Sequence, residues 1–402
     1  MRWNLALMVN TQSNALILQS GGCTSVFNRS LFGIYHEALA APEIGRILGA
    51  RHGMEGLLKG DLVDLTAQSL TRVRQASHFP GAILGTTRHS ANDGELDLAL
   101  EVISKHGVRF LFIIGRNDSA ETGNRISERI DAHGLDLSVM NVPKTIDNDL
   151  VLTDHTPGYG SAARFVALAT LGTGMDTESM SKDAPITVME VMGRDAGWLA
   201  AASVLVKGRD QDAPHVLGLP ETPVEELRFM ETIEQAYKRY GFAVAVVAEN
   251  LRGVDGVLGE DDDPLYVDSF GHPYYDGPAR YLARKLKERL NVRVRHQSPG
   301  VVQRSFLGAE SSVDGDEAEM VGRAAVQAAL AGRSGFMVTL ECSSRSPYKC
   351  NTGLAPLQRV AGAVRSLPDE YIDRDRYFVN SGFIEYARPL IGDALPIPPR
   401  FE

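Results

Sequence analysis

The segment LSVMNVPKTIDND, residues 137–149, begins as a short apolar run and ends in a polar loop. An apolar run of this length, bounded by turn residues, is typical of a buried strand. The same change from an apolar run to a glycine-rich or polar loop recurs along the chain, and helix-period segments lie between the runs. The alternation predicts a doubly wound α/β architecture with a mainly parallel sheet. The predicted strands are Ala15–Leu18, Val108–Ile114, Leu137–Val142, Ile186–Met192, Val216–Leu219 and Phe242–Ala248.

Three segments carry helix signals. The sequence TPVE at residues 222–225 resembles a capping box with proline at the first helical position, and predicts a helix toward Tyr240. Pro278–Leu290 and Asp316–Leu330 have helical spacing, and the second has acids at its N-terminal end, as the helix dipole favours. Directly before Pro278, the segment 252–277 is rich in Gly, Asp and Pro and predicts a surface excursion. Its acidic run 260–263 is either a solvated loop or a cation site.

Composition excludes several classes of protein. The chain has 402 residues and a net charge of −10, and it lacks a long basic tract, which argues against a nucleic-acid partner. Its length suggests two or three domains. The cysteines Cys23, Cys342 and Cys350 lack metal-type spacing, which argues against a disulfide framework or a zinc site. No 18-residue apolar run occurs, and the apolar stretch at the N-terminus is too interrupted for a signal peptide, so we expect no membrane span and a cytoplasmic protein.

Two loops have residues suited to phosphate or metal. The first, GGCTS at residues 21–25, lets backbone N–H groups approach an anion before a helix N-terminus, although a structural tight turn would look the same. It fits neither the dinucleotide fingerprint nor a P-loop. The second, GRNDS at residues 115–119, places Asn and Asp at a strand end, where they bind Mg²⁺ or cap a helix.

A third loop is chemically the most specific. PKTIDND, residues 143–149, combines Lys144 with Asp147, Asn148 and Asp149 at a strand end. Phosphoryl transfer to a hydroxyl needs these residue types: a base, a cation for the phosphate and acids for a metal. A turn rich in Asp and Asn is often only structural, but the combination with a lysine favours a functional site.

PKTIDND, followed by DHTPGYGSA at 154–162 and MGRDAGW at 192–198, resembles the signature set of the phosphofructokinase family. SGFIEYARPLIG near the C-terminus resembles the tail of its pyrophosphate-dependent branch. The resemblance implies two Rossmann-like doubly wound domains with the active site in the cleft between them. Residues 1–150, completed by 315–390, would bind the phosphoryl donor, residues 151–314 would bind the sugar phosphate, and residues 391–402 would form an extended arm.

The resemblance also implies roles for individual residues. Asp147 would be the general base that takes the proton from the 1-hydroxyl of fructose 6-phosphate, and Asp149 would assist the metal or the developing charge. Arg295 would reach into the site of a neighbouring subunit, so that a homo-oligomer, most simply a dimer, is expected. The implied catalytic residues are Asp147, Asp149, Lys144 and Arg194; donor contacts are Gly22, Arg88, Asp118, Ser119 and Lys144; sugar-phosphate contacts are Thr145, Asp147, Met192, Gly193, Arg194, Glu249, Arg295 and Arg304; and Mg²⁺ ligands are Asn117 and Asp118.

Two positions separate the phosphoryl donors within this family. ATP users resemble PGTIDND and GGDG, whereas pyrophosphate users resemble PKTIDND and place Asp at the last of those glycines; this sequence has Lys144 and Asp118. A carboxylate at position 118 would repel the α-phosphate of ATP, and Lys144 would supply charge to a small, dense polyanion. The resemblance therefore implies reversible transfer from pyrophosphate to fructose 6-phosphate, with Mg²⁺ as the cofactor.

The sequence also departs from the family pattern. Arg116 replaces a glycine, Asn117 stands where many relatives use Asp, and Cys23 replaces Pro or Asp. Arg116 would either add a phosphate contact or fill the pocket. The alternatives left open are an ATP-dependent enzyme, a kinase of another sugar phosphate such as sedoheptulose 7-phosphate, and a catalytically impaired regulatory subunit. A nicotinamide-dependent oxidoreductase is set aside, because the glycine fingerprint is lacking.

Overall fold

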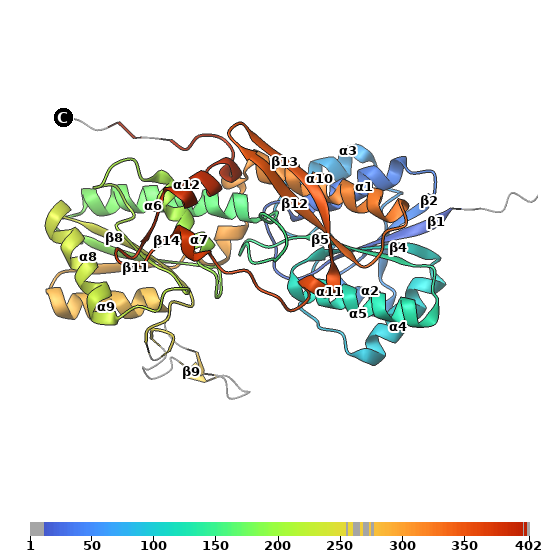
Figure 1. Cartoon of the computed structure of the whole chain (residues 1–402), viewed down its shortest axis with the longest axis horizontal. Helices are drawn as coiled ribbons and strands as arrows, with labels where there is room; N and C mark the ends of the chain where they lie inside the picture. Colours follow the sequence, from blue (N-terminus) through green and yellow to red (C-terminus); the bar gives the residue numbers. More distant parts are fainter. Residues whose placement is uncertain are drawn as a thin grey trace, which may run out of the picture.

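The structure is a computed structural model that describes residues 12–254, 256–259, 266–267, 273–274, 277–396 and 398–399. Two lobes lie side by side, and each is built on its own sheet (Figure 1). The larger sheet has seven strands in the order β13-β12-β5-β4-β1-β2-β3, and the smaller has four in the order β11-β6-β8-β7. The α/β class that the apolar runs predicted is therefore confirmed.

In the larger sheet β5, β4, β1 and β2 are parallel to one another and to β12, whereas the edge strands β3 and β13 are antiparallel. Alternate residues of β1 face opposite helical layers, which is why the strand is apolar throughout. The strands are β1 (Ser13–Gln19), β2 (Ile44–Ala50), β3 (Leu62–Asp64), β4 (Val108–Gly115), β5 (Ser138–Pro143), β12 (Phe336–Arg345) and β13 (Tyr348–Pro356). The helices are α1 (Phe27–Ala40), α2 (Met54–Lys59), α3 (Leu70–Ser77), α4 (Asp93–Lys105), α5 (Asn117–His133), α10 (Ser312–Leu330) and α11 (Leu357–Val360).

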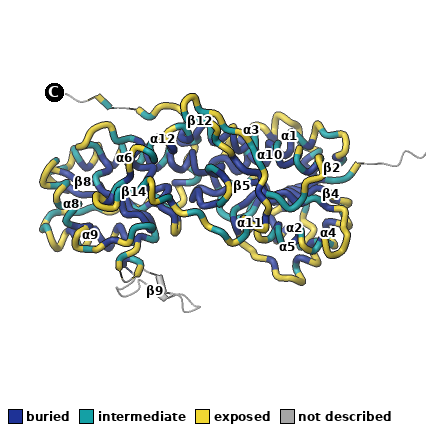
Figure 2. The backbone as a smooth tube through the Cα atoms, in the orientation of Figure 1, coloured by how far each residue is buried: buried dark blue, intermediate teal, exposed yellow. Residues whose placement is uncertain are grey.

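The smaller sheet is wholly parallel, and buried residues run through its centre as they do in the larger lobe (Figure 2). Its strands are β6 (Ile186–Val191), β7 (Val216–Gly218), β8 (Ala243–Ala248) and β11 (Val294–Gln297). Its helices are α6 (Tyr159–Ser179), α7 (Trp198–Ala202), α8 (Glu226–Tyr240) and α9 (Pro278–Leu290), with the 3₁₀ turns η1 (Ser203–Val206), η2 (Gly300–Arg304) and η3 (Leu307–Ala309) nearby. Short strands β9 (Tyr266–Val267) and β10 (Pro273–Tyr274) form a separate hairpin.

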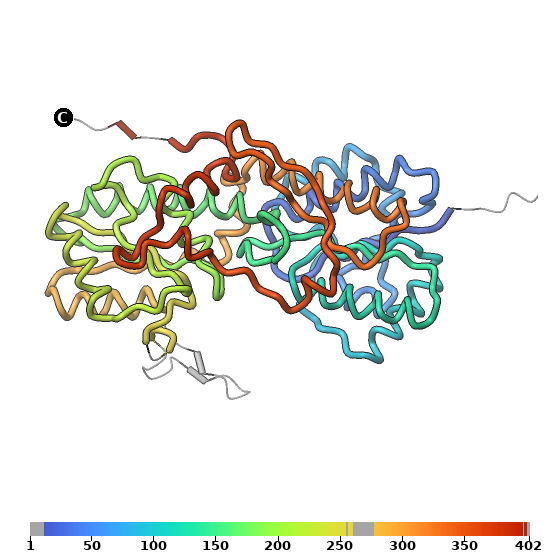
Figure 3. The backbone as a smooth tube through the Cα atoms, in the orientation of Figure 1, coloured from blue at the N-terminus to red at the C-terminus, as the bar shows by residue number. Residues whose placement is uncertain are grey.

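The chain passes between the lobes more than once (Figure 3). After α11 it returns to the smaller lobe and ends there with η4 (Asp369–Tyr371), β14 (Ile372–Asp373), β15 (Phe378–Val379), α12 (Ser381–Ala387) and η5 (Pro389–Ile391). In this returning segment the rings of Phe383 and Tyr386 pack against Trp198, so its apolar side chains belong to the core of the smaller lobe. The structure thus differs from the prediction that the whole of 315–390 completes the first domain, since only the part up to α11 joins that sheet.

All six predicted strands are present, as β1, β4, β5, β6, β7 and β8. The helix Pro278–Leu290 is present as α9, and α10 begins a turn earlier than predicted, at Ser312, because the Ser311 hydroxyl accepts a hydrogen bond from Asp314 N. The predicted capping box at Thr222 is wrong. The segment is extended there, since Val224 N donates to Arg252 O, and α8 begins only at Glu226.

Other expectations concern the acidic run, the membrane and the cysteines. The run 260–263 lies outside the described residues. Among the helices that the structure describes, none has both the length and the apolar character needed to cross a membrane. The three cysteines are free thiols, as expected for a chain without a disulfide framework.

Candidate active site

A cavity of about 250 Å³ opens at the carboxyl ends of strands from both sheets, where doubly wound folds bind their ligands. Residues after β1, β4 and β5 line it from the larger lobe, and residues after β6 and β8 line it from the smaller lobe. The lining residues are Ser20, Gly21, Gly22, Cys23, Thr24, Arg88, His89, Ser90, Arg116, Asp118, Ser119, Glu121, Thr122, Lys144, Thr145, Ile146, Asp147, Met192, Arg194, Glu249 and Arg304.

The glycine loop after β1 allows guanidinium groups to come close to it. Gly21 adopts a φ of +80°, and its N–H donates to Thr87 O at 2.9 Å, which fixes the loop beside Arg88. A Cβ atom on Gly22 would lie 2.5 Å from Arg304 Nη1, so the absence of a side chain there makes room for an arginine from the other lobe. The loop is therefore flanked by cations from both lobes.

Lys144 lies beneath this loop and is 2% exposed. Its Nζ donates to Gly22 O at 2.7 Å and lies 4.6 Å from the centre of the Phe27 ring. Burial lowers the pKa of the Lys144 amine to about 7, because the interior disfavours its charged form. At neutral pH the lysine is thus close to half-charged, and an anion entering the cavity would restore its proton.

Arg116 makes ion pairs with both carboxylates of the TIDND loop. Its Nη1 lies 2.8 Å from Asp147 Oδ2, its Nη2 lies 3.3 Å from Asp149 Oδ2, and its Nε donates to Asn117 Oδ1 at 2.8 Å. Burial raises the pKa of Asp149, although Arg116 opposes that shift, and Asp149 Oδ1 is buried without a hydrogen-bond partner. The arginine that the family pattern does not contain is thus the counter-ion of the two acids.

The TIDND loop is held in shape by residues that the sequence analysis missed. Asn148 has a φ of +56°, and its amide donates to the Tyr386 hydroxyl at 2.8 Å. Arg365 donates to Asn148 O at 2.8 Å and to Thr153 O at 2.7 Å. Arg365 and Tyr386 lie more than 200 residues beyond the loop in sequence, as the separations of 217 and 238 show. Tyr386 belongs to the SGFIEYARPLIG segment that the sequence analysis quoted, but nothing in that segment predicts its contact with Asn148.

On the smaller lobe, the loop after β6 folds around Glu249. Glu249 Oε1 accepts from Gly193 N at 3.2 Å and Arg194 N at 2.8 Å, which holds Arg194 at a φ of +52°. Burial raises the pKa of Glu249, while these N–H groups oppose the rise. Met192 N donates to Gln303 Oε1 at 3.1 Å, linking this loop to the turn that carries Arg304.

The structure brings most of the predicted site residues into one cavity. Asn117, Asp149 and Gly193 lie directly behind its lining, and both ends of the Asn117 amide are engaged, by Arg116 and by Ala363 O. Arg295 lies apart, on β11, where its Nη1 pairs with Asp176 Oδ2 at 2.5 Å. The predicted residues within the lining are Gly22, Arg88, Asp118, Ser119, Lys144, Thr145, Asp147, Met192, Arg194, Glu249 and Arg304.

The charged side chains of the cavity indicate which class of ligand it can bind. Five lysine and arginine side chains line the cavity in a protein of net charge −10, together with the carboxylates of Asp118, Glu121, Asp147 and Glu249. Cations placed around a buried acid stabilise phosphate groups and the charge that develops when a phosphoryl group moves to a hydroxyl. Fold and site together define a phosphotransferase of the doubly wound α/β class.

Comparison with known proteins agrees with this class. The sequence profile described as Phosphofructokinase matches residues 14–329. The chain therefore belongs to the phosphofructokinase family. The pyrophosphate–fructose 6-phosphate 1-phosphotransferase of Xanthomonas campestris pv. campestris is 35% identical over 393 residues, which cover 96% of this chain and 93% of the relative.

Two further relatives span nearly the same length. The crystal structure of the pyrophosphate-dependent phosphofructokinase of Nitrosospira multiformis is 32% identical, covers 97% of this chain and 94% of the other, and superposes with a TM-score of 0.88. A sulfofructose kinase of Alkalicoccus urumqiensis is 30% identical over 362 residues, covering 90% and 92% of the two chains. The second relative shows that the family also contains enzymes named for another acceptor.

The buried lysine predicts a stability effect that depends on pH. Because the pKa of Lys144 is lowered on folding, folding releases a proton between about pH 7 and the ordinary lysine value of about 10.4. The contribution of Lys144 to stability therefore rises with pH across this interval and is least favourable below it. Lys144→Met, which removes the charge, should be more stable than wild type at pH 6, and this gain should shrink at pH 9.

Urea unfolding at the two pH values measures the difference. Lys182→Met, at an exposed turn position, is the matched control and should show the same small change at both pH values. A gain from Lys144→Met that does not change with pH would contradict a lowered lysine pKa.

Proposed function

We propose that this protein transfers a phosphoryl group from pyrophosphate to the 1-hydroxyl of D-fructose 6-phosphate, giving fructose 1,6-bisphosphate and phosphate in a reversible reaction. The observation that carries the proposal is the meeting of Asp147 with Lys144 and Arg304 in one cavity between the lobes. Relatives named for this reaction, 34–35% identical over 96% of the chain, support it.

Asp147 is the base in this mechanism. It takes the proton of the sugar hydroxyl as the hydroxyl oxygen bonds to phosphorus, and the bridging P–O bond of pyrophosphate breaks to release phosphate. The loop that carries Asp147 is folded back on itself, with Asp147 N donating to Thr145 Oγ1 at 3.0 Å. The surrounding cations supply the electrostatic stabilisation on which phosphoryl transfer depends.

Carboxylates at the donor end support pyrophosphate over ATP. Asp118 is exposed in the first turn of α5, and Glu121 follows it on the same face of the helix. Both side chains line the cavity, so a nucleotide bound there would bring its α-phosphate toward two negative charges. Lys144 lies at the opposite, glycine-loop side, where it suits the smaller anion.

Mg²⁺ fits the carboxylates of the TIDND loop. The buried Asp149 Oδ1 lacks a partner, and hard oxygen ligands of this kind suit Mg²⁺. Asp149 would hold the ion, which leaves Asp147 available as the base, and the predicted ligand Asp118 lies at the cavity edge. When bound, Mg²⁺ neutralises part of the negative charge of the phosphate groups. Since Arg116 pairs with the same carboxylates, its guanidinium would then turn toward the phosphates.

A second copy of the chain completes the sugar-phosphate site in this proposal. Arg295 lies outside the cavity, and the turns η2 and η3 that follow it in the chain expose apolar side chains. There Phe306 packs on Phe165 of α6 yet remains half-exposed, which suits a subunit interface. The exposed apolar side chains are Val301, Val302, Phe306 and Leu307.

The reaction is tested by assaying purified protein with fructose 6-phosphate, Mg²⁺ and either pyrophosphate or ATP. We expect turnover with pyrophosphate and little with ATP. Asp147→Asn should lower kcat by about 10²–10⁴-fold, because an amide cannot accept the proton. Asp131→Asn, an exposed acid of α5, is the control and should keep full activity.

Three results would contradict the proposal. Turnover with ATP alone would identify an ATP-dependent enzyme, and a preference for sedoheptulose 7-phosphate or sulfofructose would identify another acceptor. No turnover with any donor, despite binding of the sugar phosphate, would identify a regulatory relative.

The ion pairs of Arg116 predict that its removal lowers the Mg²⁺ concentration needed for half-maximal rate and raises the KM for pyrophosphate. Arg116→Met leaves two carboxylates without a counter-ion, so the Mg²⁺ concentration for half-maximal rate should fall. The KM for pyrophosphate should rise about tenfold or more, because a charge-assisted phosphate contact contributes about 1.5–3 kcal/mol. Initial rates over a grid of both concentrations measure the two effects. Arg109→Met, which removes an exposed ion pair with Asp136, is the control. A lower KM for pyrophosphate would instead mean that Arg116 obstructs the cavity.

A site shared between subunits predicts complementation. Asp147→Asn and Arg295→Ala should each be nearly inactive, yet mixtures of the two under conditions of subunit exchange should recover activity. In the mixed dimer one of the two sites contains both wild-type residues. Sedimentation of the wild type should show a dimer, and a fully active monomer would contradict the arrangement.

A further inference from the structure

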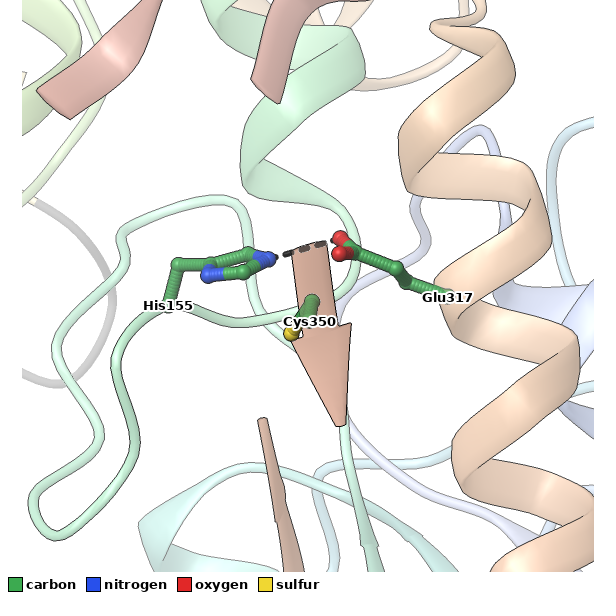
Figure 4. Close-up of side chains that lie close together, drawn as sticks. All are labelled: His155, Glu317 and Cys350. Atoms are coloured by element: carbon green, nitrogen blue, oxygen red, sulfur yellow. Dashed lines mark hydrogen bonds and ion pairs between the residues drawn. The ribbon is translucent and has the colours of Figure 1, made fainter. Parts of the chain in front are cut away.

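A second group of reactive side chains lies outside the cavity, where three segments distant in sequence meet (Figure 4). His155 comes from the loop before α6, Glu317 from α10 and Cys350 from β13. Their imidazole nitrogen, carboxylate oxygen and sulfur atoms all lie within 4.8 Å of one another. His155 and Glu317 are buried, and Cys350 is partly exposed.

The histidine is oriented as metal-binding histidines are. Its Nδ1 lies 2.8 Å from Asp154 Oδ1, and the other oxygen of Asp154 pairs with Arg345 Nη2 at 2.5 Å. Hydrogen bonds and charges from His155 and Arg345 hold the pKa of Asp154 below its ordinary value, even though burial acts to raise it. The ionised Asp154 therefore keeps a proton on Nδ1 and directs Nε2 to Glu317, 2.6 Å away. A carboxylate behind the ring in this way is a common feature of metal sites.

Hydrogen bonds hold this group together when no metal is bound. His155 Nε2 lies 2.6 Å from Glu317 Oε2, and the Tyr348 hydroxyl donates to Glu317 Oε1. A divalent cation would displace the proton shared by His155 and Glu317 and the proton of the Cys350 thiol, and the resulting carboxylate and thiolate would balance its charge.

We propose that His155, Glu317 and Cys350 bind a borderline-soft divalent cation of the Zn²⁺ class. Imidazole, carboxylate and thiolate are together the ligands of Zn²⁺ and its neighbours, whereas Mg²⁺ and Ca²⁺ prefer oxygen alone. Water can complete the tetrahedron, because Cys350 lies at partial exposure. The expectation against zinc rested on the spacing of the cysteines alone. That spacing cannot reveal this group, because His155 and Glu317 are 162 residues apart in sequence.

The cation would have a structural role behind the catalytic loop. Thr156, next to His155, donates through its N–H to Asn148 Oδ1 at 3.1 Å and through its hydroxyl to Thr145 O at 3.1 Å. A cation held by His155, Glu317 and Cys350 would therefore fasten this loop to α10 and β13. It would raise stability without taking part in phosphoryl transfer.

Cobalt substitution tests the site in the full-length protein. After treatment with a chelator, one equivalent of Co²⁺ should give a thiolate-to-cobalt charge-transfer band in the near ultraviolet, and Zn²⁺ should abolish that band and raise Tm. Cys350→Ser should lose the band and the rise in Tm. Cys23→Ser is the matched control, because Cys23 lines the catalytic cavity, where the TIDND carboxylates could also take up a metal.

Two further variants test the site independently, in case Cys350→Ser does not fold. Glu317→Gln should also lose Co²⁺ binding, whereas Glu319→Gln on the same helix should keep it. Asp154→Asn should weaken affinity by about 10–100-fold, the usual effect of losing the carboxylate behind a histidine ligand. The proposal is overturned if wild type shows no thiolate band, or if the band survives in Cys350→Ser and disappears in Cys23→Ser.

Discussion

Two buried carboxylates side by side are the constraint around which the centre of this molecule is arranged. Asp147 and Asp149 repel each other and lose hydration, and a buried acid without a partner is strongly destabilising. Arg116 supplies one guanidinium to both. The backbone between them turns through the left-handed Asn148, which Thr156 holds from the same loop and Arg365 and Tyr386 hold from the returning C-terminal segment. The return of the chain to the smaller lobe thus helps to fix the shape of the loop that carries Asp147.

The positively charged side chains of the cavity also repel one another. Lys144 is buried near Arg116 and Arg304, which lower its pKa further, while Asp147 raises it. A polyanion that enters the cavity would reduce this repulsion and favour the charged lysine, so in the proposed reaction donor binding near neutral pH would be coupled to proton uptake. By linkage, the protonated protein would then bind the donor more tightly than the deprotonated protein.

The sequence predicts the sheets well and the supports of the site poorly, for a physical reason. Apolar runs such as 110–114 and 243–248 are unbroken because both faces of a parallel sheet are covered, and they are found without tertiary information. The TPVE segment has the local chemistry of a helix start, but pairing of Val224 with Arg252 overrides it. Arg365 acts through its guanidinium on carbonyl groups far away in sequence, and such contacts leave no local pattern. The sequence does not reveal the group of His155, Glu317 and Cys350 either, because its members are also far apart in sequence.

Arg116 and Asn117, the two neighbouring residues that depart from the family pattern, are best explained together. Many family members carry Gly and Asp at these positions, whereas this chain carries Arg and Asn. An Asp at 117 would compete with Asp147 and Asp149 for the guanidinium of its neighbour. The amide of Asn117 instead accepts one hydrogen bond from Arg116 Nε without drawing its charge away, and its other end is fixed by Ala363 O. Both Nη atoms are then free to pair with Asp147 and Asp149. Arg116 and Asn117 therefore act together, because the amide leaves the guanidinium charge available to the two buried acids.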